Sequence, residues 1–341
     1  MKALVTGSAG FIGFHVARRL LADGHEVLGF DGLTPYYDVA LKRARHAVLH
    51  AMPRFSAIEA MLEDEAAVAA AVAGFAPEIV VHLAAQAGVR HSLEDPRAYA
   101  AANVTGTINL LEALRGHLPR HLLFASSSSV YGGNATMPFS ETDRTDFPAS
   151  PYAATKKAGE ALTHAYAHIH ALPTTCFRFF TVYGPWGRPD MALFKFVAAI
   201  EAGEPIDVYG EGQLERDFTY IDDLVEAIVR LIALPPRQGA PVTAAGVADS
   251  LSPVAPWRAV NIAAGQPVGL MPFIETVERA LGRTAQKRLL PRQPGDVVAT
   301  WADPGLLGAM TGYVPRTPVE IGVRAFVDWH RDWAASRRDA P

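Results

Sequence analysis

The chain has 341 residues and a formal net charge of −4, from 31 basic and 35 acidic residues. Half of its residues are hydrophobic and 19% are charged, so it can bury a large core in one domain or in two fused lobes. No run of basic residues is longer than two, as at Arg337-Arg338, which argues against nucleic acid or an anionic membrane as a partner.

The first half of the chain alternates short apolar runs with longer alanine- and leucine-rich stretches. The short runs predict strands at Ala3–Thr6, Glu26–Asp31, Glu78–Leu83, His121–Ala125 and Thr174–Phe180. The longer stretches have helical spacing and predict helices at Phe11–Ala22, Ala66–Val72, Tyr99–Leu114 and Ala153–His170. This alternation favours an α/β fold of the Rossmann type, in which helices cover both faces of a doubly wound parallel sheet. Ligands of such sheets bind beyond the carboxyl ends of the strands.

The second half is less regular and contains more proline. Residues 235–256 are rich in Pro, Gly, Ala and Ser, which predicts a surface loop. We expect a strand at Ala259–Ile262 and helices at Met191–Ala202, Asp222–Leu234, Met271–Leu281 and Pro318–Trp333.

Met1 leads directly into the first apolar run, and no apolar segment reaches the length of a membrane span. We therefore expect a cytoplasmic protein without a signal peptide. Cys176 is the only cysteine and lies in a strand pattern, so we expect a small buried residue. No metal site is predicted, because His164 and His168 have the i, i+4 spacing of a ligand pair but lack a matching carboxylate. His82, inside an apolar strand, is expected to be a core histidine.

A glycine-rich turn follows the first predicted strand. Gly7, Gly10 and Gly13 have the spacing G-x-x-G-x-x-G at the start of a helix, where glycine lets the backbone approach a pyrophosphate. Such a turn also occurs without any nucleotide. Asp31 ends the second strand, where its carboxylate can accept ribose hydroxyls and repel a 2′-phosphate. These two features predict a site for NAD rather than NADP.

Tyr152 and Lys156 are spaced i, i+4, so they share one face of a helix. A lysine ammonium near a phenol favours the phenolate, which can remove or return the proton of a hydroxyl. The alternative is a surface tyrosine beside a solvated lysine. Residues 125–133, ASSSSVYGG, follow an apolar run, so we expect a strand end that presents hydroxyls to this pair rather than a linker.

The glycine turn, the serine run and Tyr152-x-x-x-Lys156 resemble the extended short-chain dehydrogenase/reductase family of nucleotide-sugar epimerases and dehydratases. The resemblance covers nearly the whole chain. Residues 84–92, 178–191, 215–223 and 255–258 are similar to the UDP-glucuronate 4-epimerases within that family.

This resemblance implies NAD-dependent 4-epimerisation of UDP-glucuronate to UDP-galacturonate through a transient 4-keto sugar. Tyr152 would be the base for the C4 hydroxyl, Lys156 would orient the nicotinamide ribose, and Ser127 would be the third catalytic hydroxyl. Hydride would leave C4 and return to the other face of the turned sugar, so NAD would not be consumed. The implied cofactor-binding residues are Gly7, Gly10, Phe11, Ile12, Gly13, Asp31, Ala84, Ala85, Ser126 and Lys156.

The resemblance also implies residues for the UDP-sugar: Ser128, Ser129, Thr181 and Arg188 near the sugar and its carboxylate, Arg216 and Asp296 at the diphosphate and uridine ribose, and Arg90 at a phosphate or carboxylate. Residues 1–180 would form the NAD-binding domain, to which 217–263 return. Residues 181–216 and 264–341 would form a smaller C-terminal lobe that binds the nucleotide sugar. The apolar faces of residues 99–114 and 153–170 would pair two copies in a homodimer.

One position departs from the family. An acidic residue followed by an aliphatic one usually meets the adenine amino group after the third strand, and Met61 stands at that place. That contact is either lost or supplied by Glu59.

Other activities of the family stay open to different degrees. A 4,6-dehydratase needs an Asp-Glu pair where this chain has Ser128 and Ser129, and a UDP-glucuronate decarboxylase usually has a glutamate near this point. Neutral hydroxyls there favour epimerisation over loss of water or CO₂. A 4-epimerase for UDP-glucose or UDP-N-acetylglucosamine is the main alternative. A non-catalytic NAD-binding protein is disfavoured because both Tyr152 and Lys156 are present.

Overall fold

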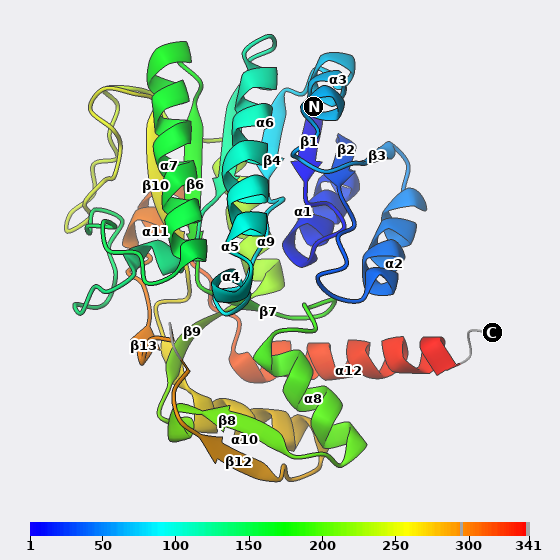
Figure 1. Cartoon of the computed structure of the whole chain (residues 1–341). Coiled ribbons are helices and arrows are strands. Elements are labelled where there is room, and N and C mark those ends of the chain that lie inside the picture. Colours follow the sequence, from blue (N-terminus) through cyan, green and yellow to red (C-terminus); the bar gives the residue numbers. More distant parts are fainter. Residues whose placement is uncertain (294–295, 339–341) are drawn as a thin grey trace.

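The structure, a computed structural model, describes residues 1–293 and 296–338 (Figure 1). Its larger part is a seven-stranded sheet in the order β10-β6-β5-β4-β1-β2-β3, and every neighbouring pair of strands is parallel. The Rossmann-type sheet predicted from the alternation is therefore confirmed. The strands are β1 (Lys2–Thr6), β2 (Glu26–Asp31), β3 (Phe55–Glu59), β4 (Ile79–His82), β5 (His121–Ala125), β6 (Thr174–Phe179) and β10 (Trp257–Ile262).

Helices cover both faces of this sheet, which is why its central strands consist almost entirely of buried residues. One layer contains α1 (Phe11–Ala22), α2 (Val39–His50), α9 (Ile221–Ile232) and α11 (Gly305–Thr311). The opposite layer contains α3 (Glu65–Phe75), α6 (Gly106–Leu114) and α7 (Pro151–His170), and Figure 1 shows α6 and α7 side by side in front of the sheet.

A smaller lobe lies at one end of the sheet, below it in Figure 1. It is entered through β7 (Thr181–Tyr183), which starts directly after β6 and pairs with β9 (Glu215–Tyr220). The lobe has its own apolar core, to which α8, α10 and α12 contribute. Its remaining elements are α8 (Ala192–Ala202), β8 (Ile206–Tyr209), a 3₁₀ turn (Gly210–Gly212), β11 (Pro267–Gly269), α10 (Leu270–Leu281), β12 (Lys287–Leu290), β13 (Ala299–Thr300) and α12 (Val319–Arg338).

The segment predicted as one helix over 99–114 is interrupted. After α4 (His91–Glu94), the chain forms α5 (Pro96–Ala100), a π-helical turn (Ala101–Thr105) and only then α6. Asn103 lies in the π turn, where its side chain bonds the backbone of Gln86 and the hydroxyl of Thr155. The wider turn thus places an amide between the β4 loop and α7, a use typical of π turns near functional sites.

The helix α2 and the strands of the smaller lobe were not predicted from the sequence, because they are short or carry many charges. Among residues 1–293 and 296–338, no helix combines the length and apolarity needed to cross a membrane. The domain boundaries drawn from the sequence stay a prediction.

Candidate active site

A cavity of about 740 Å³ lies at the carboxyl ends of the parallel strands. It is large enough for a dinucleotide or a comparable ligand. The structure brings many of the residues predicted from the sequence together in its wall: Gly7, Gly10, Phe11, Ile12, Gly13, Asp31, Ala84, Ala85, Ser126, Ser127, Tyr152, Lys156 and Arg188.

The turn between β1 and α1 fits a pyrophosphate because it has no room for side chains. Gly7 has a positive φ of 74°, and a Cβ on it would lie 2.7 Å from the amide nitrogen of Ala84. A Cβ on Gly13 would lie 2.0 Å from the carbonyl oxygen of Gly7. Gly10 is the N-cap of α1 and uses no side-chain cap, so the first amide groups of the helix face this side of the cavity.

Asp31 ends β2 beside this turn and is largely buried. Its Oδ2 accepts from the amide of Ala9 at 3.0 Å, and its Oδ1 accepts from the amide of Leu33 at 2.8 Å. These two bonds hold the carboxylate in place and leave lone pairs for ligand hydroxyls. The position and charge predicted for a ribose-binding residue are therefore present.

Ser127, Tyr152 and Lys156 converge at the other end of the cavity. Tyr152 and Lys156 lie in the first turns of α7, which Ser150 caps by accepting from the amide of Ala153 at 3.1 Å. Burial raises the pKa of Tyr152, and the Ser127 hydroxyl and the charge of Arg188 oppose that rise. Burial also lowers the pKa of Lys156 to about 8, and its Nζ donates to the carbonyl oxygen of Ala125 at 2.8 Å.

The electrostatics at Tyr152 differ from the sequence prediction. The phenolate was expected to gain from the Lys156 ammonium, but desolvation of the phenol dominates its pKa. The reason is geometric, because Lys156 is bound to the end of β5.

A buried ion pair supports the serine run from behind. Glu160 and Arg178 have side chains 2% and 4% exposed, and the guanidinium donates to both carboxylate oxygens at 2.9 and 3.0 Å. Ser126 Oγ donates to the same carboxylate at 2.7 Å. Arg178 also donates to the hydroxyl of Tyr131 at 3.0 Å, which in turn donates to Asn261 at 2.6 Å. The network joins β5, β6, β10 and α7 at the position where the catalytic residues were predicted.

The serine run is only partly a strand. The strand β5 ends at Ala125, and Ser128–Tyr131 form a 3₁₀ turn that Ser127 caps by accepting from the amide of Ser129 at 3.2 Å. Ser128 and Ser129 do not line the large cavity. They are half-buried on the turn beside it.

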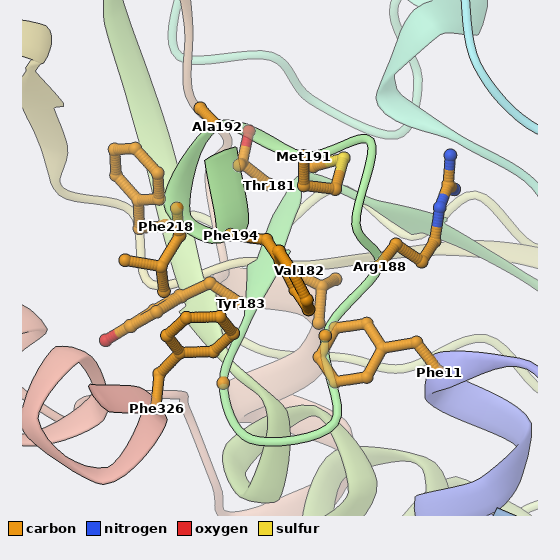
Figure 2. Close-up of a pocket in the computed structure, with 13 residues that line it drawn as sticks. Phe11, Thr181, Val182, Tyr183, Arg188, Met191, Ala192, Phe194, Phe218 and Phe326 are labelled. Carbon is orange, nitrogen blue, oxygen red and sulfur yellow. The ribbon is translucent and has the colours of Figure 1, made fainter. Parts of the chain in front are cut away.

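Thr181 and Arg188 line a small neighbouring cavity of about 30 Å³, with Phe11 and Met191 (Figure 2). The guanidinium of Arg188 points away from Phe326 and the other aromatic side chains in this view. Asp190 holds that guanidinium through two hydrogen bonds, of 3.0 and 2.5 Å. The arginine is therefore fixed toward the large cavity, which it also lines.

Arg90, Arg216 and Asp296 form a separate cluster outside the lining of that cavity. Asp296 accepts from Arg216 at 2.9 Å and from Arg90 at 3.4 Å, and Arg90 stacks on the ring of Tyr209. This arrangement brings Arg216 and Asp296, which the resemblance assigned to the diphosphate and uridine ribose, together with Arg90, which was predicted to bind a phosphate or a carboxylate. Two guanidinium groups near one another form an anion site once the carboxylate is displaced.

Sequence reasoning missed several residues of the cavity wall. Tyr36 and Lys42 reach the cavity from the loop and the helix that follow β2. Tyr36 donates to Asp190 at 3.2 Å, and Lys42 donates to Thr34. Met191 and Glu63 also line the cavity. The adjacent tyrosines and the basic residues after Asp31 were the available signal for the first two.

The histidines that were not predicted to be metal ligands form hydrogen bonds with other groups of the protein. His82 bonds Thr6 at 2.7 Å, and burial lowers its pKa to about 3, as expected of a core histidine. His164 bonds Ser252, and His168 bonds the carbonyl of Val254. Within the part of the chain that the structure describes, no cluster of three or more His, Cys, Asp and Glu side chains suits a metal ion.

Comparisons with known proteins agree with this geometry. The model of the NAD dependent epimerase/dehydratase family matches residues 3–243. A protein of Rhizobium meliloti named probable UDP-glucuronate 4-epimerase is 58% identical, over 97% of each chain. The crystal structure of UDP-glucuronic acid 4-epimerase from Bacillus cereus, in complex with UDP-glucuronic acid and NAD, is 31% identical with a TM-score of 0.86, over 98% of this chain and 100% of the other.

UDP-glucose 4-epimerase from Thermotoga maritima, solved with UDP-glucose, is also similar, at 27% identity and a TM-score of 0.82 over 98% of this chain and 100% of that one. The same architecture therefore accommodates both uronic acid and neutral sugars in relatives, and the residues of the sugar site must decide between them. The chain belongs to the NAD dependent epimerase/dehydratase family.

Proposed function

We propose that this protein catalyses the NAD-dependent 4-epimerisation of UDP-glucuronate to UDP-galacturonate. The observation that carries the proposal is the convergence of Ser127, Tyr152 and Lys156 at one end of a cavity whose other end has the glycine turn and Asp31. The similarity to UDP-glucuronate 4-epimerases over nearly the whole chain supports the choice of substrate.

Each catalytic residue has one role in this proposal. Bound NAD supplies the acceptor for the hydride of C4. Tyr152 removes the proton of the C4 hydroxyl and returns it after the sugar has turned over. Ser127 bonds the C4 oxygen and opposes the rise in the pKa of Tyr152 caused by burial. Lys156, whose pKa is lowered by burial and whose Nζ now donates to Ala125, would hold the nicotinamide ribose and stabilise the phenolate.

The sugar carboxylate would be held by neutral donors and one arginine. Ser128 and Ser129, on the turn beside the large cavity, and Thr181, in the small neighbouring cavity, would supply hydroxyls. Arg188 is already oriented toward the large cavity by Asp190. A carboxylate that keeps its hydrogen bonds resists loss as CO₂ from the 4-keto sugar. Because Ser128 and Ser129 occupy the positions of the acid and base of a dehydratase, elimination of water has no catalyst there.

The nucleotide part of the substrate would bind at Arg90, Arg216 and Asp296. The two guanidinium groups would bind the diphosphate, and Asp296 would move from them to the uridine ribose. The substrate nucleotide would then lie in the smaller lobe formed by residues 181–216 and 264–341, and the dinucleotide in residues 1–180 and 217–263.

We also propose a cytoplasmic homodimer in which α7 of each copy contributes to the interface. Ala154, Ala158, Ala161 and Ala165 form an exposed or half-exposed stripe at helical spacing on α7. Ile169 continues the apolar surface and is 68% exposed. Sedimentation velocity of the wild type and of Ala161→Glu tests this, since the charge is expected to shift the protein toward the monomer.

The activity is tested by proton NMR of the purified enzyme with UDP-glucuronate and, separately, with UDP-glucose, without added reductant. We expect UDP-galacturonate to accumulate from the first substrate and no comparable conversion of the second. Faster formation of UDP-galactose would assign the enzyme to neutral sugars. Release of CO₂ as fast as epimerisation would refute the role given to the serines.

A further inference from the structure

Glu63 presents an unusual carboxylate in the loop after β3. Glu63 is one of the residues that line the large cavity, and its Oε2 atom is buried without a hydrogen-bond partner among the described residues. Burying an acceptor without a donor costs about 1–3 kcal/mol, and more for a charged group. Such an atom is expected where a ligand supplies the missing donor.

The position of Glu63 indicates which part of a dinucleotide it would meet. In a Rossmann-type site the pyrophosphate lies at the glycine turn and the adenosine ribose lies at the acid that ends β2, here Asp31. The base must lie beyond the ribose, over the next loop of the sheet. Residues 60–63 form the cavity wall in that loop, directly after β3, the neighbour of β2.

The other acidic candidate in this loop does not reach the cavity. Glu59 is absent from the cavity wall and lies 3.7 Å from Arg43, and both side chains are more than half exposed. Met61 offers a base only a weakly accepting thioether. Its sulfur packs on Gly32, where a Cβ would lie 2.2 Å from Sδ, so it forms an apolar floor beside Asp31.

We propose that Glu63 binds the adenine base of NAD by accepting a hydrogen bond from its exocyclic amino group, while Met61 packs against the base. The sequence interpretation, in which the contact was lost or supplied by Glu59, is replaced by a carboxylate two residues after Met61. The inference rests on the NAD site of the proposed function but not on the identity of the sugar.

The proposal predicts discrimination at a single atom of the nucleotide. The amino group of adenine donates to a carboxylate. The oxo group of hypoxanthine only accepts, so the carboxylate would repel it. The wild-type protein should therefore bind NAD more tightly than nicotinamide hypoxanthine dinucleotide. Glu63→Gln can donate as well as accept, so it should reduce or reverse that preference.

The test is calorimetric titration of both dinucleotides into nucleotide-free wild type, Glu63→Gln and Glu59→Gln. We expect Glu63→Gln to weaken NAD binding about tenfold, as one charge-assisted hydrogen bond would, and to leave binding of the hypoxanthine analogue unchanged or improved. Glu59→Gln, the matched control outside the cavity, should leave both dissociation constants unchanged. Equal weakening of both dinucleotides, or no change in either, would overturn the proposal.

Thermal unfolding supplies a second readout that a merely structural role would not produce. Because Oε2 lacks a partner without ligand, Glu63→Gln should leave the nucleotide-free protein as stable as wild type or more stable. The increase in Tm caused by saturating NAD should shrink. A loss of stability without ligand would contradict the inference. If the protein prefers NAD over the hypoxanthine analogue as expected but does not epimerise UDP-glucuronate, only the proposed activity would be refuted.

Discussion

The end of the cavity that holds Tyr152 and the cluster of Arg90, Arg216 and Asp296 satisfy their polar groups in different ways. At the catalytic end, Ser126, Glu160 and Arg178 are buried and bonded to one another. In the lobe, Arg216 and Asp296 form a partly exposed pair, and Arg90 joins it at longer range. The support behind the serine run is therefore complete without ligand, whereas the proposed nucleotide site must exchange partners to bind a diphosphate.

The largest expected effect concerns the catalytic end. Tyr152→Phe removes only the hydroxyl that exchanges the proton, so we expect turnover to fall by about 10²–10⁴-fold. Dinucleotide affinity should not change, because Lys156 and the glycine turn remain. Steady-state kinetics combined with titration of NAD checks both statements. Unchanged turnover would remove Tyr152 from the mechanism.

A second prediction tests whether the buried pair sets catalytic geometry. Glu160→Gln leaves Arg178 buried without its counter-ion, so the free energy of unfolding should fall by about 3–5 kcal/mol. Asp249→Asn breaks another buried pair, with Arg258, near the amino end of β10. Denaturant unfolding and kcat of the folded fraction should show a loss of stability in both variants but a loss of kcat only in Glu160→Gln. An equal kcat loss in both would make the first pair merely structural.

The third prediction concerns Arg216 in the smaller lobe. Arg216→Ala should raise KM for UDP-glucuronate about thirtyfold, because a charge-assisted bond to the diphosphate is lost, and should change kcat little. Arg288→Ala is a matched control in the same lobe, since Arg288 pairs with Asp207 at the surface. A fall in kcat with constant KM in Arg216→Ala would place this arginine at the chemistry instead.

The smallest expected effect is a pH dependence of stability. Burial raises the pKa of Glu141 to about 7, so the folded state binds this proton more tightly than the unfolded state. The resulting stability is present below about pH 4.5 and is lost as the pH rises to about 7. Glu141→Gln should therefore be more stable than wild type by about 1–3 kcal/mol at pH 8 and no more stable at pH 4.5. Denaturant unfolding at both values measures the difference, and its absence at pH 8 would place the ionised carboxylate in a well-solvated site.

Sequence patterns predicted the sheet and the cavity wall because both depend on local features. Strict runs such as Ile79–His82 indicate buried strands, and the glycine spacing and Tyr152-x-x-x-Lys156 are short-range patterns. The cofactor side of the cavity, with Gly7, Asp31, Tyr152 and Lys156 in its wall, was therefore predictable from the sequence alone.

The rest depends on contacts between distant segments. Nothing local indicates that Arg178 pairs with Glu160 behind the serine run. Asp190 is only two residues from Arg188, but whether the pair faces the cavity depends on how the whole loop folds. The orphaned carboxylate oxygen of Glu63 is likewise a property of burial, which the residue types of the loop do not reveal. The roles assigned to these side chains stay predictions until the variants are measured.

The most direct test of the central claim is the fate of a deuterium at C4. UDP-glucuronate labelled with deuterium at C4 is incubated with the enzyme in ordinary water, and the product is analysed by proton NMR and mass spectrometry. If hydride leaves C4 and returns to the same carbon, UDP-galacturonate should keep the label and no CO₂ should form. Washout of the label into solvent, or a pentose product, would contradict the account.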